Sequence, residues 1–206
     1  MLFTEEIYFK QEFFSVLLRE ADNLLMQVVD DHKSIWKSYA GDVIASYDLK
    51  DYKLVLDDLI IDKRLMKDNE KFCDVEPCID VVTGNKVFQA LNCPVGYTGG
   101  IIIGRELVDT YSFGENHSEY PCYCYKYVYE LIFDQGALTM SIDHSKAMLR
   151  IRKNIEKGFR NVKNAKDLRC IHKFLSQTFC RSYERNRKLR IWKKKIYRVK
   201  HKLNDE

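Results

Sequence analysis

The stretch YPCYCYKYVYELIF, residues 120–133, places a tyrosine at every second position from Tyr123 to Tyr129. Alternate side chains of a β-strand point to opposite faces, so this spacing predicts a strand with the tyrosines on one face. The same face continues into Leu131 and Phe133, whose side chains are pure hydrocarbon. We therefore expect the tyrosine face to be packed under helices, with each hydroxyl near a rim or a backbone partner.

An exposed row of aromatic side chains is the alternative interpretation of this stretch. Platforms that stack the bases of single-stranded nucleic acid use exposed aromatics, but they lie beside cationic grooves that hold the phosphates. Residues 71–143 contain 4 basic and 10 acidic residues, so the surroundings of the tyrosines would repel phosphate. The charge balance therefore favours a buried tyrosine face.

Four more segments near the tyrosine stretch are predicted to be strands. Proline and glycine are concentrated between residues 71 and 143, which indicates many turns and short connections there. Between the turns lie the runs CIDVV (78–82), KVFQAL (86–91), GGIIIG (99–104) with ELVDTYSF (106–113), and ALTMSI (137–142). Together with the tyrosine strand they predict an antiparallel meander sheet of about five strands.

The N-terminal segment has the residue spacing of helices. An amphipathic helix is predicted from Thr4, as N-cap, to about Asp31, because apolar residues recur there every three or four positions. These apolar residues are Phe14, Leu17, Leu18, Ala21, Leu24, Leu25 and Val28. Two weaker helical patterns follow, one through Trp36, Tyr39, Val43 and Tyr47 and the other through Tyr52, Val55, Leu56, Leu59 and Ile60. The second of these patterns also fits a strand at its beginning.

Helical spacing returns after the sheet segment. From His144 onward, one pattern runs through Met148, Ile151, Ile155, Phe159 and Val162, and a second through Leu168, Ile171 and Leu175. A last pattern carries Leu189, Trp192, Ile196, Val199 and Leu203 as a narrow apolar seam in a basic surrounding. These patterns predict two helices over the sheet and a third at the C-terminal end.

The predicted fold class is α+β, with an antiparallel meander sheet flanked by N-terminal and C-terminal helices. Residues 1–182 are expected to form a single domain with an acidic helical part (1–70), the sheet (71–143) and helices (144–182). Residues 183–206 are expected to form a basic C-terminal helix that either projects or packs on the core. The oligomeric state is left open.

Charge is divided unequally along the chain. Residues 1–143 contain 13 basic and 25 acidic residues, whereas residues 144–206 contain 21 and 5. Several cations that touch phosphates together give salt-sensitive binding with little sequence preference. The leading hypothesis is therefore a small non-enzymatic protein that binds nucleic acid or a nucleoprotein complex through its basic C-terminal helix. The expected binding residues are Arg185, Arg187, Lys188, Arg190, Trp192, Lys193, Lys194, Lys195, Arg198 and Lys200.

Other partners fit the same helix. Its cations and apolar seam also suit an acidic groove on a protein partner, and the acidic N-terminal half suits a basic partner, as in a regulator or inhibitor. An anionic membrane surface is a further alternative, although no apolar run is long enough to cross a bilayer. The simplest alternative is that the seam packs on the core of the protein itself.

An enzymatic function is the third hypothesis. His117 and Glu119 in the loop GENHSE could join Asp143 and His144 if the meander brought its ends together, as in a metal-dependent hydrolase. The glycine-rich run GYTGGIIIG lacks the Lys-Ser/Thr pair of a phosphate-binding loop, so no nucleotide cofactor is predicted. No residue set reaches the specificity of a known catalytic motif, and a binding protein is favoured over an enzyme.

The cysteines bear on the cellular compartment. There are seven, an odd number with irregular spacing, which is typical of reduced thiols in a cytosolic protein. No pair has the two-residue gap of a zinc knuckle, so no metal site is predicted. The start of the sequence, MLFTEE, is acidic where a secretory signal has a basic flank. We therefore expect a cytoplasmic protein.

Overall fold

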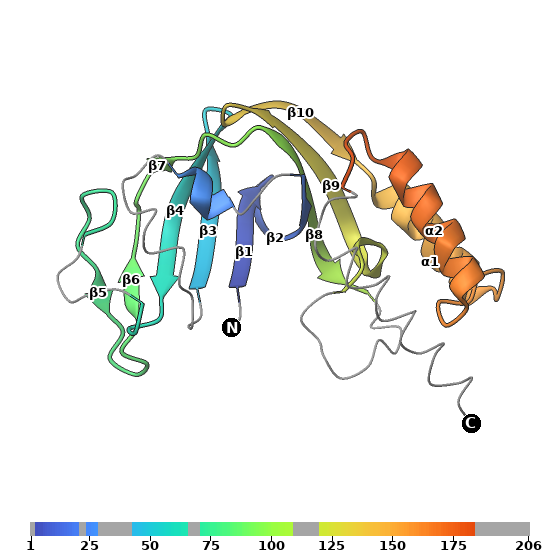
Figure 1. The fold of residues 1–206 in the computed structure, drawn as a ribbon, viewed down its shortest axis with the longest axis horizontal. Coiled ribbons are helices and arrows are strands. Elements are labelled where there is room, and N and C mark those ends of the chain that lie inside the picture. The colour runs from blue at the N-terminus through green and yellow to red at the C-terminus, as the bar shows by residue number, and fades with distance from the viewer. Residues whose placement is uncertain (1–2, 21–23, 29–42, 66–70, 109–119, 184–206) are drawn as a thin grey trace. The chain divides into compact units, whose positions relative to one another are not determined.

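The structure, a computed structural model, describes residues 3–20, 24–28, 43–65, 71–108 and 120–183. The chain divides into two compact units. The first comprises Met1–Val16, Asp22–Thr98 and Leu131–Ser141, and the second comprises Leu17–Ala21, Gly99–Glu130 and Ile142–Glu206. Three strands contribute residues to both units: β2 (Glu12–Arg19), β9 (Tyr125–Asp134) and β10 (Ala137–Asp143), all labelled in Figure 1.

The first unit begins with strands where helices were predicted. β1 (Phe3–Phe9) pairs antiparallel with β2, and β3 (Val43–Lys50) pairs antiparallel with β4 (Lys53–Ile61), while β1 and β3 run parallel. A short 3-10 helix, η1, covers Leu24–Gln27. The predicted helix from Thr4 to Asp31 is therefore wrong, and so are the described parts of the two weaker helices, which are β3 and β4. The alternative that the second weak pattern begins as a strand is confirmed by β4.

Two tight turns explain this difference. Lys10 and Gln11 join β1 to β2, and Asp51 and Tyr52 join β3 to β4; all four have positive φ angles between 50° and 66°. Such turns usually contain glycine or asparagine, so their sequence gives no warning of a hairpin. Pairing along the resulting strands then overrides the helical spacing of the apolar residues.

The rest of the first unit extends this sheet. β5 (Cys78–Ile79) pairs with β6 (Lys86–Phe88), which pairs with β4; β7 (Cys93–Pro94) and the start of β10 also pair with β4. With β8 (Gly99–Leu107), whose residues belong to the second unit, ten strands take part in the pairing. The pairing is mixed because β1 and β3 are parallel. The predicted five-stranded antiparallel meander is therefore too small and of the wrong type, although all five of its segments contain strands.

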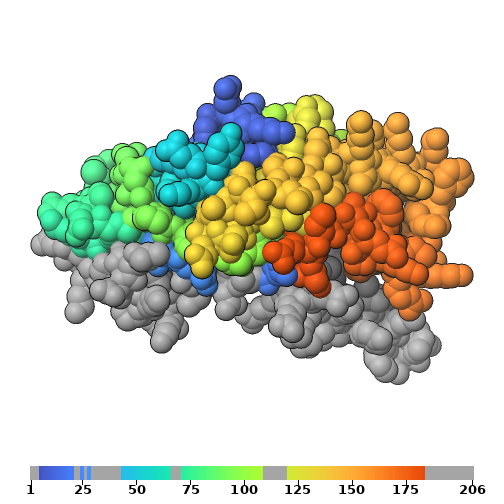
Figure 2. All heavy atoms as spheres, turned by 90° about the horizontal axis from the view of Figure 1, so that it is seen from above, coloured from blue at the N-terminus to red at the C-terminus, as the bar shows by residue number. Residues whose placement is uncertain are grey.

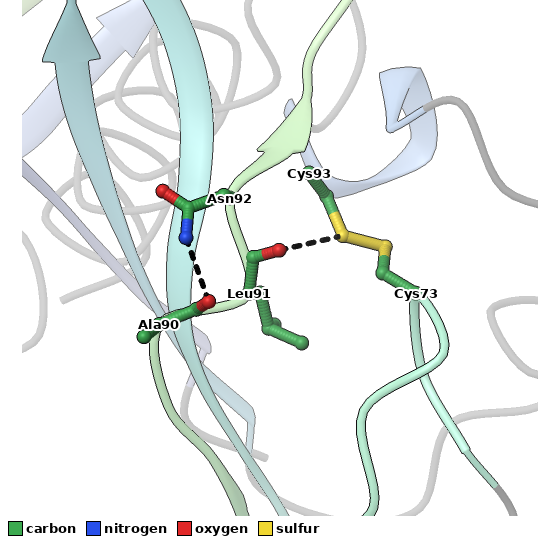
Figure 3. The surroundings of a disulfide bond; sticks show 5 residues. All are labelled: Cys73, Ala90, Leu91, Asn92 and Cys93. Atoms are coloured by element: carbon green, nitrogen blue, oxygen red, sulfur yellow. Dashed lines mark hydrogen bonds between the residues drawn. A yellow bond between two sulfur atoms is a disulfide. The ribbon is translucent and has the colours of Figure 1, made fainter.

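A disulfide bond between Cys73 and Cys93 fastens a loop of the first unit to β7, as Figure 3 shows. The Cα atoms of the two cysteines lie 6.3 Å apart, within the range that a disulfide spans. Cys93 is buried, and its Sγ also lies near the backbone oxygen of Leu91. The expectation that all the cysteines are reduced is therefore wrong for this pair, which sequence spacing alone did not reveal.

Replacing Cys73 and Cys93 with serine is expected to lower the free energy of unfolding by about 2 to 3 kcal/mol, because the bond closes a chain segment with a sequence separation of 20. Urea unfolding followed by circular dichroism measures the change. Dithiothreitol should destabilise the wild-type protein by a similar amount and leave the double variant unaffected. An equal response of both proteins to the reductant would contradict the prediction.

The second unit packs two helices against β9. A 3-10 turn, η3 (Cys122–Cys124), precedes β9, and α1 (Ser145–Glu156) and α2 (Ala165–Thr178) follow β10. In Figure 1 the two helices lie side by side, next to β9. Their buried residues share one core with residues of β8, η3, β9 and the chain that follows α2: Ile102, Cys122, Tyr123, Cys124, Val128, Met148, Ile151, Ile171, Phe179 and Tyr183. The prediction of two C-terminal helices over the sheet is thus confirmed.

The tyrosine stretch is only partly as expected. Tyr129, Leu131 and Phe133 are buried, but Tyr125 and Tyr127 are half-buried. The helices pack on the opposite face of the strand, where Val128 belongs to their core and its N–H donates to the Ser145 hydroxyl. Tyr123 belongs to the same core and Tyr125 packs against it, so the prediction that helices cover the tyrosine face holds for the start of the stretch only. Both faces of this strand are largely covered, and alternation of apolar residues cannot tell which face receives the helices.

Candidate nucleic-acid interface

One face of α1 carries a row of cations. The four side chains are spaced by four, three and four residues, so they share one face of the helix. They are Lys146, Arg150, Lys153 and Lys157, and all are exposed. Met148 and Ile151, which are buried in the core, occupy the opposite face. The same helix therefore has an apolar side that fastens it to the sheet and a cationic side that faces solvent.

The neighbouring helix α2 repeats this arrangement. Lys166, Arg169 and Lys173 are exposed and spaced by three and four residues, while Leu168 and Ile171 are buried on the other side. The side chain of Asn164 accepts hydrogen bonds from the N–H groups of Lys166 and Asp167, and so caps the start of the helix. We call the seven exposed cations of α1 and α2 the cationic stripes.

The two stripes belong to one surface. The guanidinium carbon of Arg150 in α1 lies 5.7 Å from the ring centroid of Phe174 in α2, so the two helices contact each other at this point. Figure 2 shows both helices, in orange, at the molecular surface. From Lys146 to Lys157 the stripe of α1 extends for about 16 Å at the rise of an α-helix. This length allows several phosphates of a nucleic-acid strand to be contacted together.

The stripes are not neutralised by the protein around them. Residues 144–183 contain 11 basic and 2 acidic residues, a net charge of +9. Among the described residues, this segment forms ion pairs between Arg160 and Asp167 and between Arg181 and Glu20, each at 3.8 Å, and His144 contacts Glu130 at 2.9 Å. None of the seven stripe cations pairs with a described carboxylate. The stripes are therefore free to bind an external anion.

This arrangement disfavours a purely structural role. Five pairs of like charges lie three or four residues apart along the stripes: 146/150, 150/153, 153/157, 166/169 and 169/173. Each such pair destabilises a helix by about 0.2 to 0.5 kcal/mol. The stripes thus lower the stability of the helices that carry them, and a bound polyanion would remove this repulsion.

The end of α2 is fastened to the sheet by one buried carboxylate. Glu130 of β9 is fully buried and accepts hydrogen bonds from the backbone N–H groups of Cys180 (2.9 Å) and Arg181 (3.0 Å). It also accepts one from the Tyr183 hydroxyl, at 2.8 Å, and pairs with His144 Nε2 at 2.9 Å. We call Glu130 and these four groups the Glu130 anchor.

The anchor is tightly packed and holds a charged carboxylate. Burial by itself raises the pKa of Glu130, but the hydrogen bonds from His144, Cys180, Tyr183 and Arg181 together outweigh it, so the pKa lies below its ordinary value. Gly100 completes the fit, because a Cβ atom at this position would lie 2.3 Å from the Tyr183 hydroxyl oxygen. The anchor therefore fixes the chain directly before the basic residues that start at position 185.

The binding residues predicted from the sequence, from Arg185 to Lys200 and including Trp192, lie outside the described residues. The cationic stripes were not singled out, although their spacing is visible in the sequence. In the sequence the stripes stand out less than the denser run of cations between residues 185 and 202. In α1 and α2 a basic residue at every third or fourth position is enough to form a continuous row on one face of the helix.

The candidates for metal-dependent chemistry receive little support. His117 and Glu119 lie outside the described residues. His144 is buried at the start of α1 and directs its Nε2 toward Glu130, and no group of three histidine, cysteine or acidic residues in the described ranges is placed to hold a metal ion. Burial raises the pKa of the Cys122 thiol to about 12, so this thiol stays protonated at neutral pH.

Two further properties bear on the interface. No helix in the described ranges is both long and apolar enough to span a membrane. Comparison with known proteins gives no match: no family model, no curated protein and no solved structure is similar to this chain. The function proposed for the cationic stripes therefore rests on the exposure, charge and contacts of their own residues.

Proposed function

We propose that the protein is a small non-enzymatic nucleic-acid-binding protein that holds a phosphate backbone on its basic C-terminal third. The observation that carries this proposal is the presence of seven exposed stripe cations that form no ion pair with any described residue, on helices whose other side is buried in the core. Phosphates would replace the missing counter-charges, and the counterions that leave the nucleic acid would drive binding. The ten basic residues between positions 185 and 202 would add to the same affinity.

An acidic protein partner would meet the same cations, but the described surface fits it less well. Helices that dock in a protein groove present several large apolar side chains on one face, spaced by three or four residues. Between residues 144 and 183 the exposed large apolar side chains are Leu149 and Phe159, with 42% and 66% of their surface exposed. A surface dominated by cations is better suited to a polyanion than to an apolar groove.

The salt dependence of binding tests this proposal. Fluorescence anisotropy of a labelled 20-nucleotide strand and of a 20-base-pair duplex should show binding at 50 mM salt that weakens steeply toward 200 mM. Five simultaneous phosphate contacts predict a slope of log affinity against log salt of about −3.5 on the single strand and about −4.5 on the duplex. No binding at 50 mM salt, or a slope near zero, would contradict the proposal.

A further inference from the structure

The loop between α1 and α2 displays a large aromatic side chain to solvent. Phe159 is 66% exposed, more than any other large apolar side chain described in the second unit. It follows Gly158, whose φ of +72° ends α1 in the left-handed conformation that suits glycine. An aromatic side chain this exposed contributes little to the core. A single exposed apolar residue is common on protein surfaces, so its charged neighbours decide how it is interpreted.

The loop that carries Phe159 is well ordered by its own hydrogen bonds. The N–H of Arg160 donates to the backbone oxygen of Asn154 at 3.1 Å, and the N–H of Asn161 donates to the Asp167 carboxylate at 3.1 Å. The Asn161 side chain in turn accepts from the N–H of Lys163 at 2.8 Å. Phe159 is therefore held in an exposed position by a defined backbone, and a ligand that covers it would not have to order the loop first.

Basic residues lie on both sides of Phe159 in the sequence. Lys157, Arg160 and Lys163 are exposed, and neither lysine forms an ion pair with a described residue. Lys157 is also the last cation of the α1 stripe. An aromatic face beside unpaired cations is the combination by which proteins bind single-stranded nucleic acid, since the ring stacks on a base while the cations hold the neighbouring phosphates.

From this placement we infer that Phe159 stacks on an unpaired base, and that the preferred ligand of the cationic stripes is single-stranded DNA or RNA. This inference rests on the proposed function. In a duplex the bases are already stacked on one another and offer no free face at the phosphate backbone, so the Phe159 ring has no partner there. The phosphate contacts of the stripes are common to both ligands, whereas the ring contact is made by the single strand alone.

Phe159→Ala tests the inference. The variant should bind a 20-nucleotide oligo(dT) or oligo(U) about tenfold more weakly than the wild-type protein, and a 20-base-pair duplex within twofold of it. The oligo(dT) and oligo(U) arms distinguish DNA from RNA as the better ligand. Phe159→Tyr, which keeps an aromatic ring, should restore most of the single-strand affinity. Leu149→Ala is the matched control, because it removes an exposed side chain of the same surface that cannot stack, and it should change neither affinity by more than twofold.

A second readout reports the stacking itself. Phe159→Trp should show fluorescence quenching on addition of oligo(dT) beyond any change in the wild-type protein, because a base stacked on the indole quenches its emission. Because position 159 is exposed, all these variants should differ little in thermal unfolding, and equal melting curves by circular dichroism verify this. If the duplex quenched the added tryptophan of Phe159→Trp as strongly as oligo(dT) does, the inference would be overturned.

Failure of the inference and failure of the proposed function give different results. If the wild-type protein binds neither strand nor duplex, the proposed function fails. If it binds both but Phe159→Ala weakens both equally, or neither, the stripes bind phosphate and the stacking role of Phe159 is wrong. A loss of binding to anionic phospholipid vesicles on Phe159→Ala, with unchanged oligonucleotide binding, would likewise overturn it in favour of a membrane contact.

Discussion

Replacing Glu130 with alanine is expected to lower the free energy of unfolding by about 3 to 5 kcal/mol, as measured by urea unfolding. The substitution removes the acceptor of the Glu130 anchor and leaves His144, two backbone N–H groups and the Tyr183 hydroxyl without it, all close to the core of the second unit. His144 and Tyr183 are buried and the hydrogen bonds of the two N–H groups are part-buried, so donors that lose this acceptor keep much of the cost of having left water. The loss should therefore exceed that of an ordinary surface substitution several-fold.

Two controls separate the anchor from general effects of charge. Glu156→Ala removes an exposed carboxylate from α1 and should change the free energy of unfolding by less than about 0.5 kcal/mol. Glu130→Gln keeps one acceptor oxygen but turns an amide NH₂ toward the donors, and should give an intermediate loss. If Glu130→Ala stayed within 1 kcal/mol of the wild-type protein, the anchor would not hold the end of α2.

The anchor also predicts how stability depends on pH. Because the pKa of Glu130 in the folded protein lies below its ordinary value of 4.5, the carboxylate contributes stability that is fully present above that value. This contribution is lost as the pH falls through the lowered pKa, when the folded protein must protonate the carboxylate and give up its hydrogen bonds. The free energy of unfolding should therefore fall in acid more steeply for the wild-type protein than for Glu130→Gln.

The helices of the second unit could be predicted from the sequence and the hairpins of the first could not. In α1 and α2 the apolar residues follow the helical period, and turn residues such as Gly158 and Asn164 separate the two helices. In β1 and β2 the same kind of spacing occurs in strands, because runs of only seven or eight residues fit either structure. The Lys10-Gln11 turn that decides between them has positive φ angles without glycine, and thus no sequence signature.

The stripes could have been predicted from the sequence, whereas the Glu130 anchor and the exposure of Phe159 could not. The stripes depend on residue spacing within a single helix, which can be read directly from Lys146 onward. The Glu130 anchor depends on contacts between residues 14 to 53 positions apart, and pairings at such distances are set by the fold. In the sequence Glu130 is simply one acidic residue in an apolar strand. Phe159 matched the helical period and was predicted as a core position, but α1 ends at Glu156, before this residue.

Reversing four stripe charges, with Lys146, Lys153, Lys166 and Lys173 each replaced by glutamate, is expected to lower the affinity for oligo(dT) about a thousandfold at 50 mM salt. Four lost phosphate contacts should also make the salt slope about 3 units shallower. A matched control replaces Lys10, Lys53, Lys63 and Lys71, exposed lysines of the first unit, and so changes the net charge by the same amount. It should weaken binding only a few-fold, because these lysines are not part of the stripes.

The same variant is expected to unfold at higher urea concentration than the wild-type protein. Each introduced carboxylate lies three or four residues from Arg150, Lys157 or Arg169, so all five like-charge pairs become attractive pairs. The change should stabilise the protein by about 1 to 2 kcal/mol. If the cations stabilised the fold, reversing their charge would instead lower the free energy of unfolding. If the variant binds oligo(dT) more weakly but unfolds at higher urea concentration, the stripes bind an external polyanion and lower the stability of the helices. If both its affinity and its stability fall, the cations stabilise the fold, and the proposal is contradicted.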